Sequence, residues 1–176
     1  MEKKIFLSLG SNLGDRESNL AQATMALSIN LKIKNIKSSS YYESEPLYNT
    51  DQPKFLNSVV CCESDLNPFE FFDVTRRIEK MLGRPKKRLK NHPRIIDIDL
   101  LFFGDSVLET EELTLPHPMV SLRKFVLIPL SEIAPNHSIP NTNMIIKDLL
   151  NNCPDNSKVV KHIMGTQAWE ISITSQ

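Results

Sequence analysis

Two aspartates stand one residue apart in an apolar run in the second half of the chain. Asp97 and Asp99 lie within the segment 95–103, whose other residues are all Ile, Leu or Phe. In a strand both carboxylates would point to one face, roughly 6.6 Å apart along the backbone. Neighbouring carboxylates on a half-buried face are unfavourable unless a cation neutralises them, and oxygen ligands suit Mg²⁺. The alternative is a pair of solvent-facing aspartates, which the apolar residues Leu101 and Phe103 on the same face make less favourable.

The same alternation predicts that the opposite face of this strand is an unbroken apolar surface. That face would carry Ile96, Ile98, Leu100 and Phe102.

A basic segment, 84–94, leads directly into the aspartate strand. It contains six Lys or Arg residues and no Asp or Glu. Such a run on its own is typical of a solvated loop. Cations for phosphate oxygens beside carboxylates for Mg²⁺ form the arrangement that phosphoryl-type transfer needs. The chain has no Gly-x4-Gly-Lys-Ser/Thr loop, so a nucleotide would be held in another way than in P-loop enzymes.

Length and composition indicate one soluble domain. The chain has 176 residues, 40% hydrophobic and 24% charged, with 21 basic and 21 acidic residues and a net charge of zero. A neutral total gives no reason to expect nucleic acid as a partner. We expect a single domain over 1–176, with 135–176 as a variable C-terminal portion. No targeting segment or membrane span is predicted. Three cysteines without metal or disulfide spacing indicate free thiols and a cytoplasmic location, with adjacent Cys61 and Cys62 buried on opposite faces.

Five elements precede the basic segment, and the aspartate strand follows it. Together they have the order strand–helix–strand–strand–helix–strand. The pattern predicts strands over 5–9, 33–43, 55–62 and 95–103 and helices over 15–31 and 67–82. Leu20, Ala23, Leu27 and Leu31 form the apolar stripe of the first helix. This order is typical of an α+β, ferredoxin-like βαββαβ core, a mainly antiparallel sheet with two helices packed on one face.

Further elements are predicted beyond this core. We expect a short hairpin arm near Val107 and Leu108, a helix over 122–133, a short helix over 145–150 and a peripheral strand in the tail.

Four separated stretches, in order, resemble one enzyme family. They are Leu9-Gly10-Ser11-Asn12-Leu13-Gly14-Asp15; Glu45-Pro46 through Asp51-Gln52-Pro53-x-Phe55-Leu56-Asn57; Gly83-Arg84 through Pro93-Arg94-x-Ile96-Asp97-Ile98-Asp99-Leu100; and Leu115-Pro116-His117-Pro118 with Arg123-x-Phe125-Val126-Leu127-x-Pro129-Leu130. Together, over residues 4 to 135, they are similar to the 6-hydroxymethyl-7,8-dihydropterin pyrophosphokinase family of folate biosynthesis.

The resemblance implies transfer of the diphosphoryl group of ATP to the pterin hydroxymethyl oxygen, releasing AMP. It implies two Mg²⁺ ions on Asp97 and Asp99, ATP as co-substrate, and phosphate contacts from Arg84 and Arg94, which with the two aspartates would be the catalytic residues. The nucleotide contacts implied in the same way are Glu79, Arg84, Arg94, Ile98, Thr114, His117 and Arg123. The pterin contacts implied are Ser44, Pro46, Leu47, Phe55, Asn57, Asp97 and Phe125. The basic segment would act as a lid over ATP.

The predicted pterin residues have suitable chemistry. Phe55 and Phe125 would supply two aromatic faces for a flat heterocycle, although core packing is the usual role of a phenylalanine. Asn57 offers a donor and an acceptor to the pterin edge, and it shares a strand face with Phe55. We expect small-molecule substrates, no nucleic acid or membrane partner, and a monomer or weak dimer.

Two departures from the family pattern fall near the predicted nucleotide site. Asn91-His92 stands where an aromatic residue and a glycine are common, and Met119 stands where an arginine is common.

Two other functions are compatible with parts of this sequence. An RNA-binding module of the same fold would carry aromatic residues where Asp97 and Asp99 stand. A different transferase built on Asp-x-Asp would not require the set of Phe55, Asn57 and Phe125.

Overall fold

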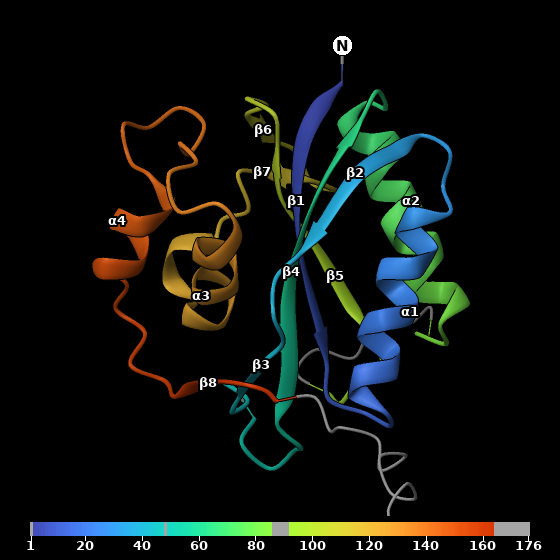
Figure 1. Cartoon of the computed structure of the whole chain (residues 1–176), viewed down its shortest axis with the longest axis vertical. Helices are drawn as coiled ribbons and strands as arrows, with labels where there is room; N and C mark the ends of the chain where they lie inside the picture. The colour runs from blue at the N-terminus through green and yellow to red at the C-terminus, as the bar shows by residue number, and fades with distance from the viewer. Residues whose placement is uncertain (1, 48, 86–91, 164–176) are drawn as a thin grey trace, which may run out of the picture.

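The computed structural model describes residues 2–47, 49–85 and 92–163 (Figure 1). Its strands are β1 Lys3–Ser11, β2 Ile33–Ser38, β3 Tyr42–Ser44, β4 Phe55–Ser64, β5 Asp97–Phe103, β6 Leu108–Glu109, β7 Thr114–Leu115 and β8 Val159–Lys161. Its helices are α1 Arg16–Ser28, α2 Pro68–Met81, α3 Lys124–Ile133 and α4 Ile146–Asn151, with a 3₁₀ turn at Val120–Leu122.

The central sheet has the strand order β5-β1-β4-β3-β8, and β2 pairs with the other half of the β4 edge. All of these pairings are antiparallel. The helices α1 and α2 cover one face of the sheet, and α3 and α4 lie on the other (Figure 1). The predicted α+β fold with helices packed on an antiparallel sheet is confirmed.

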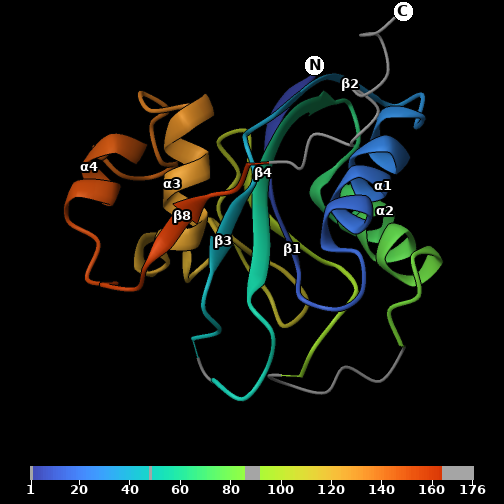
Figure 2. The same ribbon diagram turned by 60° about the horizontal axis from the view of Figure 1, so that its bottom comes forward.

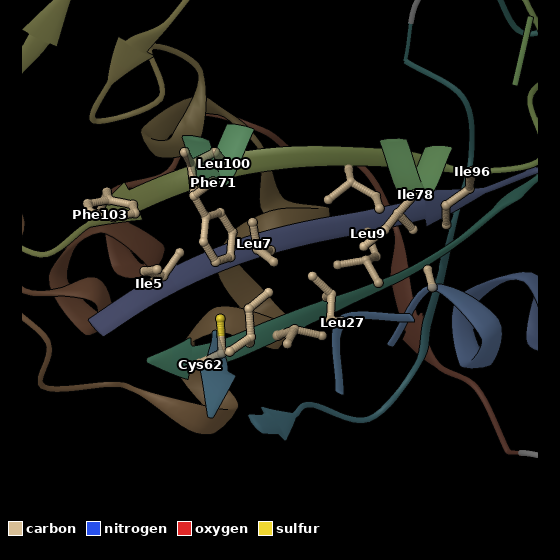
Figure 3. Packing of buried hydrophobic residues seen from close by; sticks show 14 of the residues in the cluster. Ile5, Leu7, Leu9, Leu27, Cys62, Phe71, Ile78, Ile96, Leu100 and Phe103 are labelled. Carbon is tan, nitrogen blue, oxygen red and sulfur yellow. The ribbon is translucent and has the colours of Figure 1, made fainter. Parts of the chain in front are cut away.

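The core beneath α1 and α2 contains the apolar residues that the strand patterns predict. Phe71 and Ile78 of α2 and Leu27 of α1 pack on Leu7 and Leu9 of β1 (Figure 3). A second cluster lies between the opposite sheet face and α3, and it contains Phe6, Val59, Leu127 and Leu130 among others. Because the sheet is covered on both faces, β1 and β4 read as nearly continuous apolar runs.

The alternation along β5 changes at Leu101. Phe6 of β1 opposes Phe102, whereas the next residue, Leu7, opposes Leu100. Ile96, Ile98 and Leu100 share one apolar face, as predicted, and this face packs under α1 and α2. Phe102, however, lies in the α3 cluster and Phe103 in the α2 cluster. The prediction of one unbroken face through Phe102 is therefore wrong, because a bulge shifts the register by one residue.

Two element boundaries also differ from the sequence prediction. Helix α1 ends at Ser28, so Leu31 lies outside it and is 93% exposed. The predicted strand 33–43 is divided into β2 and β3, since Ser39 interrupts the pairing: its Oγ accepts a hydrogen bond from Val59 N at 2.9 Å.

Local sequence signals set both ends of helix α2, and its C-terminal end leads to the predicted phosphate-binding residue Arg84. Asn67 caps its start with a capping box, and Pro68 occupies the first turn. Gly83 then adopts φ +97°, a left-handed conformation that favours glycine after a helix. This turn directs Arg84 back toward β5, and Arg84 N donates to Glu79 O at 3.0 Å.

All three cysteines are free thiols, as predicted. Cys61 and Cys62 are buried in the two different clusters, and burial raises the pKa of Cys62 to about 12. Both thiols therefore remain protonated and unreactive at physiological pH. Among the described residues no helix has the length and apolarity required to cross a membrane.

The contacts of His137, which lies outside the predicted site, should make the stability of the fold sensitive to acid. Its ring lies 4.6 Å from the Phe6 ring and 5.7 Å from the Phe102 ring, between centroids. Burial, and then the nearby Lys4, lower its pKa, with Asp105 opposing. The unfolded chain therefore binds more protons below pH ~6.5, so stability falls as pH drops below that value, by at most about 1.4 kcal/mol per pH unit. In urea unfolding at pH 7.5 and 5.5, His137→Leu should lose less stability than the wild type, and equal losses would contradict this role.

Candidate active site

One pocket opens on the α3-facing side of the sheet, at the end where β1 finishes and β4 and β5 begin. Figure 2 turns this end of the sheet toward the viewer. Its walls come from β1, β3, the connection 45–54, β4, the start of β5 with the residues before it, and the start of α3. Its lining residues are Ser8, Gly10, Ser44, Glu45, Leu47, Gln52, Phe55, Asn57, His92, Arg94, Asp97, Asp99, Arg123 and Phe125.

A row across three strands forms the floor of this pocket. The register places Gly10 of β1 opposite both Asp97 of β5 and Asn57 of β4. A Cβ at residue 10 would lie 3.2 Å from Asn57 Oδ1 and 3.9 Å from Phe55 Cδ1. The missing side chain therefore leaves a hollow between a carboxylate and a carboxamide.

The amide of Asn57 is held in a fixed orientation. Asn57 is 2% exposed. Its Nδ2 donates to Ser44 Oγ at 3.0 Å and to Tyr42 O at 3.3 Å. Strand β3 thus positions the amide, and the oxygen faces the side of Gly10.

Two phenyl rings line the pocket, and each lies beside an arginine. The Arg94 guanidinium is 5.1 Å from the Phe55 ring centroid, and that of Arg123 is 5.9 Å from the Phe125 ring centroid. Both separations are in the range of cation–π contacts. The pocket therefore combines flat apolar faces with cations at their edges.

The two carboxylates share the α3 side of β5 and are surrounded by arginines. Asp97 pairs with Arg84, and its Oδ2 lies 3.2 Å from Arg94 Nε. Asp99 Oδ2 is 3.9 Å from Arg123 Nη1. Burial, and then the charge of Asp97, raise the pKa of Asp99 above its usual range. A cation placed between the carboxylates of Asp97 and Asp99 would offset the free energy needed to keep both of them charged.

The donor set fits a magnesium ion that also binds phosphate. Within the described parts of the chain no group of three or more His, Cys, Asp or Glu side chains converges on a common point. Two carboxylates alone leave most of an octahedral shell to other oxygens. Mg²⁺ is commonly bound in this way, by one or two carboxylates together with substrate phosphates and water.

Glu79 lies behind the carboxylates and does not line the pocket. It is 3% exposed. Its Oε1 accepts from Ile98 N at 2.9 Å and pairs with Arg84. Arg84 is thus held between Glu79 on α2 and Asp97 on β5. The Ile98 side chain points into the core under α1 and α2.

His117 is a neutral histidine that lies beside β5. Its backbone N donates to Leu101 O at 2.9 Å, and its Nδ1 accepts from Met119 N at 3.2 Å. Burial, and then the charge of Arg123, lower its pKa to about 4. The neutral ring therefore carries its proton on Nε2, which makes that atom a hydrogen-bond donor.

The structure brings most of the predicted site residues together and leaves some outside. Of these, Ser44, Leu47, Phe55, Asn57, Arg94, Asp97, Asp99, Arg123 and Phe125 line the pocket, whereas Pro46, Glu79, Arg84, Ile98, Thr114 and His117 do not. Pro46 is buried between two lining residues, and Thr114 pairs with Glu109 in the hairpin of β6 and β7.

Five lining residues have no role in the sequence prediction: Ser8, Gly10, Glu45, Gln52 and His92. Gly10 and Gln52 stand in the quoted motifs, but Gly10 has its partners on β4 and β5, and Gln52 accepts a hydrogen bond from Asn12, 40 residues away. These contacts depend on the tertiary fold and are not visible in a local sequence pattern. The predicted lid falls mainly on 86–91, which lies outside the described residues.

The fold and pocket define an α+β enzyme that gathers carboxylates, arginines and aromatic rings at one end of an antiparallel sheet. Residues 6–135 match the model of the 7,8-dihydro-6-hydroxymethylpterin-pyrophosphokinase (HPPK) family. The 2-amino-4-hydroxy-6-hydroxymethyldihydropteridine pyrophosphokinase of Bacillus subtilis is 43% identical over 133 residues, which cover 76% of this chain and 79% of the relative. The enzyme of the same name from Haemophilus influenzae is 36% identical over 140 residues, covering 80% and 87%.

A solved structure supports the fold. The HPPK-DHPS of Plasmodium falciparum superposes with a TM-score of 0.67 at 17% identity, over 86% of this chain and 45% of that longer chain. This chain belongs to the HPPK family. It is an ATP-dependent diphosphotransferase that acts on ATP and a hydroxymethyl pterin in folate synthesis. The alternative of an unrelated Asp-x-Asp transferase is thereby excluded.

Proposed function

We propose that the pocket on the α3 side of the sheet is the catalytic centre for transfer of the ATP diphosphoryl group to the pterin hydroxymethyl oxygen. The observation that carries this proposal is the row of Asp97, Gly10 and Asn57 across three strands. It places carboxylates beside a hollow that ends at a fixed amide. A hydroxymethyl group in this hollow would be next to the carboxylates while its ring reaches the amide.

The pterin side of the pocket uses shape and one fixed amide. Phe55 and Phe125 would stack on the two faces of the heterocycle. Asn57, oriented by Ser44, would pair with its edge. Pro46 and Leu47, in the connection 45–54, would form the remaining wall.

The nucleotide side uses cations and neutral donors. Arg94 and Arg123 lie at the pocket edge and would leave their carboxylate partners to bind phosphate oxygens, for which the planar guanidinium suits bidentate contacts. Arg84 would stabilise the charge that develops on the transferred group. His117 would donate from Nε2. Contacts from Glu79, Ile98 and Thr114 are part of the same proposal.

Asp97 and Asp99 would hold two Mg²⁺ ions together with ATP phosphates. Bound there, the metal supplies Lewis-acid stabilisation of phosphate charge and lowers the pKa of the pterin hydroxyl. The residues of the chain themselves orient the two substrates and exclude water, and no covalent enzyme intermediate is required.

The direct test is product analysis with ATP, Mg²⁺ and 6-hydroxymethyl-7,8-dihydropterin. Equal amounts of AMP and pterin diphosphate are expected, without free pyrophosphate. ADP as the nucleotide product would contradict diphosphoryl transfer.

Gly10→Ala is expected to weaken pterin binding. The added Cβ would fill the hollow and contact Asn57 Oδ1 closely. The Asn57 amide cannot easily move away, because two hydrogen bonds hold it. We expect the KM for the pterin to rise about tenfold, equivalent to ~1.4 kcal/mol, and the KM for ATP to change much less.

Gly14→Ala is the control for this prediction. Gly14 has φ +68° and open space around its Cβ position, so alanine should cost about 1 kcal/mol of stability without changing the pterin KM. Equal KM values for Gly10→Ala and the wild type would show that the hollow is not the pterin site.

We further propose a single catalytic domain over 1–176 with 135–176 as its variable part, acting in the cytoplasm as a monomer or weak dimer. Small molecules are its expected partners, without nucleic acid or membrane. Its net charge of zero supports this assignment.

A further inference from the structure

Asn12 connects two walls of the pocket through one buried side chain. It follows β1 directly and is 1% exposed. Its Oδ1 accepts from Arg94 N at 2.8 Å. Its Nδ2 donates to Gln52 Oε1 and to Pro53 O, both at 3.1 Å. Its backbone N donates to Arg94 O at 3.1 Å.

The partners of Asn12 belong to opposite sides of the pocket. Gln52 lies in the connection 45–54, the wall assigned to the pterin, and its Nε2 holds the connection together by donating to Asn49 O at 2.8 Å. Arg94 leads into β5, lies over Phe55 and approaches Asp97. Both Gln52 and Arg94 line the pocket. Asn12 itself does not.

A rigid link of this kind transmits displacement. The Arg94 backbone is held by Asn12 through one donor and one acceptor, so the two residues move together. When Arg94 leaves Asp97 for a phosphate, any shift of its backbone reaches Gln52 through the amide of Asn12. The Gln52 wall would then adjust before or during pterin binding.

We propose that Asn12 is a positioning residue that couples the nucleotide side of the pocket to the pterin side. The proposal rests on the proposed function of the pocket. Occupation of either side stabilises the arrangement of Arg94, Asn12 and Gln52 that the other side requires. Energetic coupling between two sites is reciprocal and usually corresponds to a factor of about 5 to 150 in affinity.

Asn12→Asp tests this role with a nearly isosteric change. Aspartate keeps an oxygen acceptor for Arg94 N but places a second oxygen against Gln52 Oε1 and Pro53 O. Calorimetry would give the Kd of the dihydropterin with and without saturating Mg²⁺ and a non-hydrolysable ATP analogue. The wild type should bind the pterin more tightly with the analogue, and Asn12→Asp should reduce that ratio at least about fivefold. Reciprocity requires the same reduction in the effect of the pterin on the Kd of the analogue.

Asn19→Asp is the matched control. Asn19 Nδ2 donates to Ser11 Oγ at 3.1 Å and to Leu13 O at 2.8 Å. The same chemical change therefore affects the same turn without touching Gln52 or Arg94. The coupling ratio should remain that of the wild type.

Gln52→Leu removes one Asn12 contact from the other side and should lower the ratio in the same direction but less, because the bond to Pro53 O remains. It decides the question if thermal melting shows that Asn12→Asp does not fold.

Three results would overturn the proposal: wild-type coupling in Asn12→Asp, an equal loss in Asn19→Asp, or no coupling in the wild type. With Asn12→Asp unfolded, wild-type coupling in Gln52→Leu would overturn it as well. A wild type that neither binds the pterin nor releases AMP would instead disprove the proposed function.

Discussion

Replacing Asp97 or Asp99 with asparagine is expected to lower kcat/KM at least about a thousandfold, or ~4 kcal/mol. Asparagine has nearly the same shape but no charge, so it would hold Mg²⁺ and the ATP phosphates poorly. Steady-state kinetics at several Mg²⁺ concentrations would measure the loss. Excess Mg²⁺ should restore little of it, because the ligand charge is missing.

The stability of the Asp99 variant separates function from folding. Burial and the charge of Asp97 raise the pKa of Asp99, so Asp99→Asn should leave the free energy of unfolding unchanged or raise it by up to about 2 kcal/mol. Asp97→Asn should destabilise the fold modestly, since Arg84 keeps Glu79 as a partner. Most of the activity surviving in both variants would show that these carboxylates do not hold the metal.

Replacing Arg84 with methionine is expected to damage both folding and catalysis. Glu79 is buried, and Arg84 is a cation that pairs with it. Removing one partner of a buried ion pair typically costs about 3–5 kcal/mol. If Arg84 acts on the transferred group as proposed, its loss should also lower kcat by about a hundredfold. Urea unfolding and steady-state kinetics would measure the two effects.

The double variant Glu79→Gln/Arg84→Met tests the two roles separately. It should recover most of the stability, because both charged members of this buried ion pair are replaced by uncharged groups, but it should not recover kcat. Arg94→Ala is the comparison, because Arg94 is more exposed than Arg84. This replacement should cost under ~1 kcal/mol of stability and still reduce the rate. If the double variant regained kcat with stability, the role of Arg84 would be structural only.

Features set by local periodicity could be predicted from the sequence. The pairing of Asp97 with Asp99 on one strand face needs only the two-residue repeat of a strand. The same repeat predicts Phe55 and Asn57 together, and both line the pocket. The order of the core elements followed from the change between two-residue and helical repeats. The sequence also predicts a short C-terminal helix and a peripheral strand, and the structure has them as α4 and β8.

Features set by long-range register could not be predicted in this way. The hollow at Gly10 depends on its partners in both β4 and β5. The bulge at Leu101 arises from the pairing with β1, and it moves Phe102 to the α3 face. The burial of Glu79 depends on the packing of α2 on β5, and the contacts of Asn12 bring together residues 40 to 82 positions apart. None of these long-range contacts can be inferred from a local sequence pattern.

Counting bound metal ions would show directly whether Asp97 and Asp99 hold them. Mn²⁺, as a spectroscopic substitute for Mg²⁺, would be titrated by electron paramagnetic resonance in the presence of a non-hydrolysable ATP analogue and the dihydropterin. The proposed site predicts two bound ions per chain in the wild type and at most one in Asp97→Asn/Asp99→Asn, since the analogue alone retains one ion. Two ions bound with unchanged affinity in the double variant would show that the metal lies elsewhere.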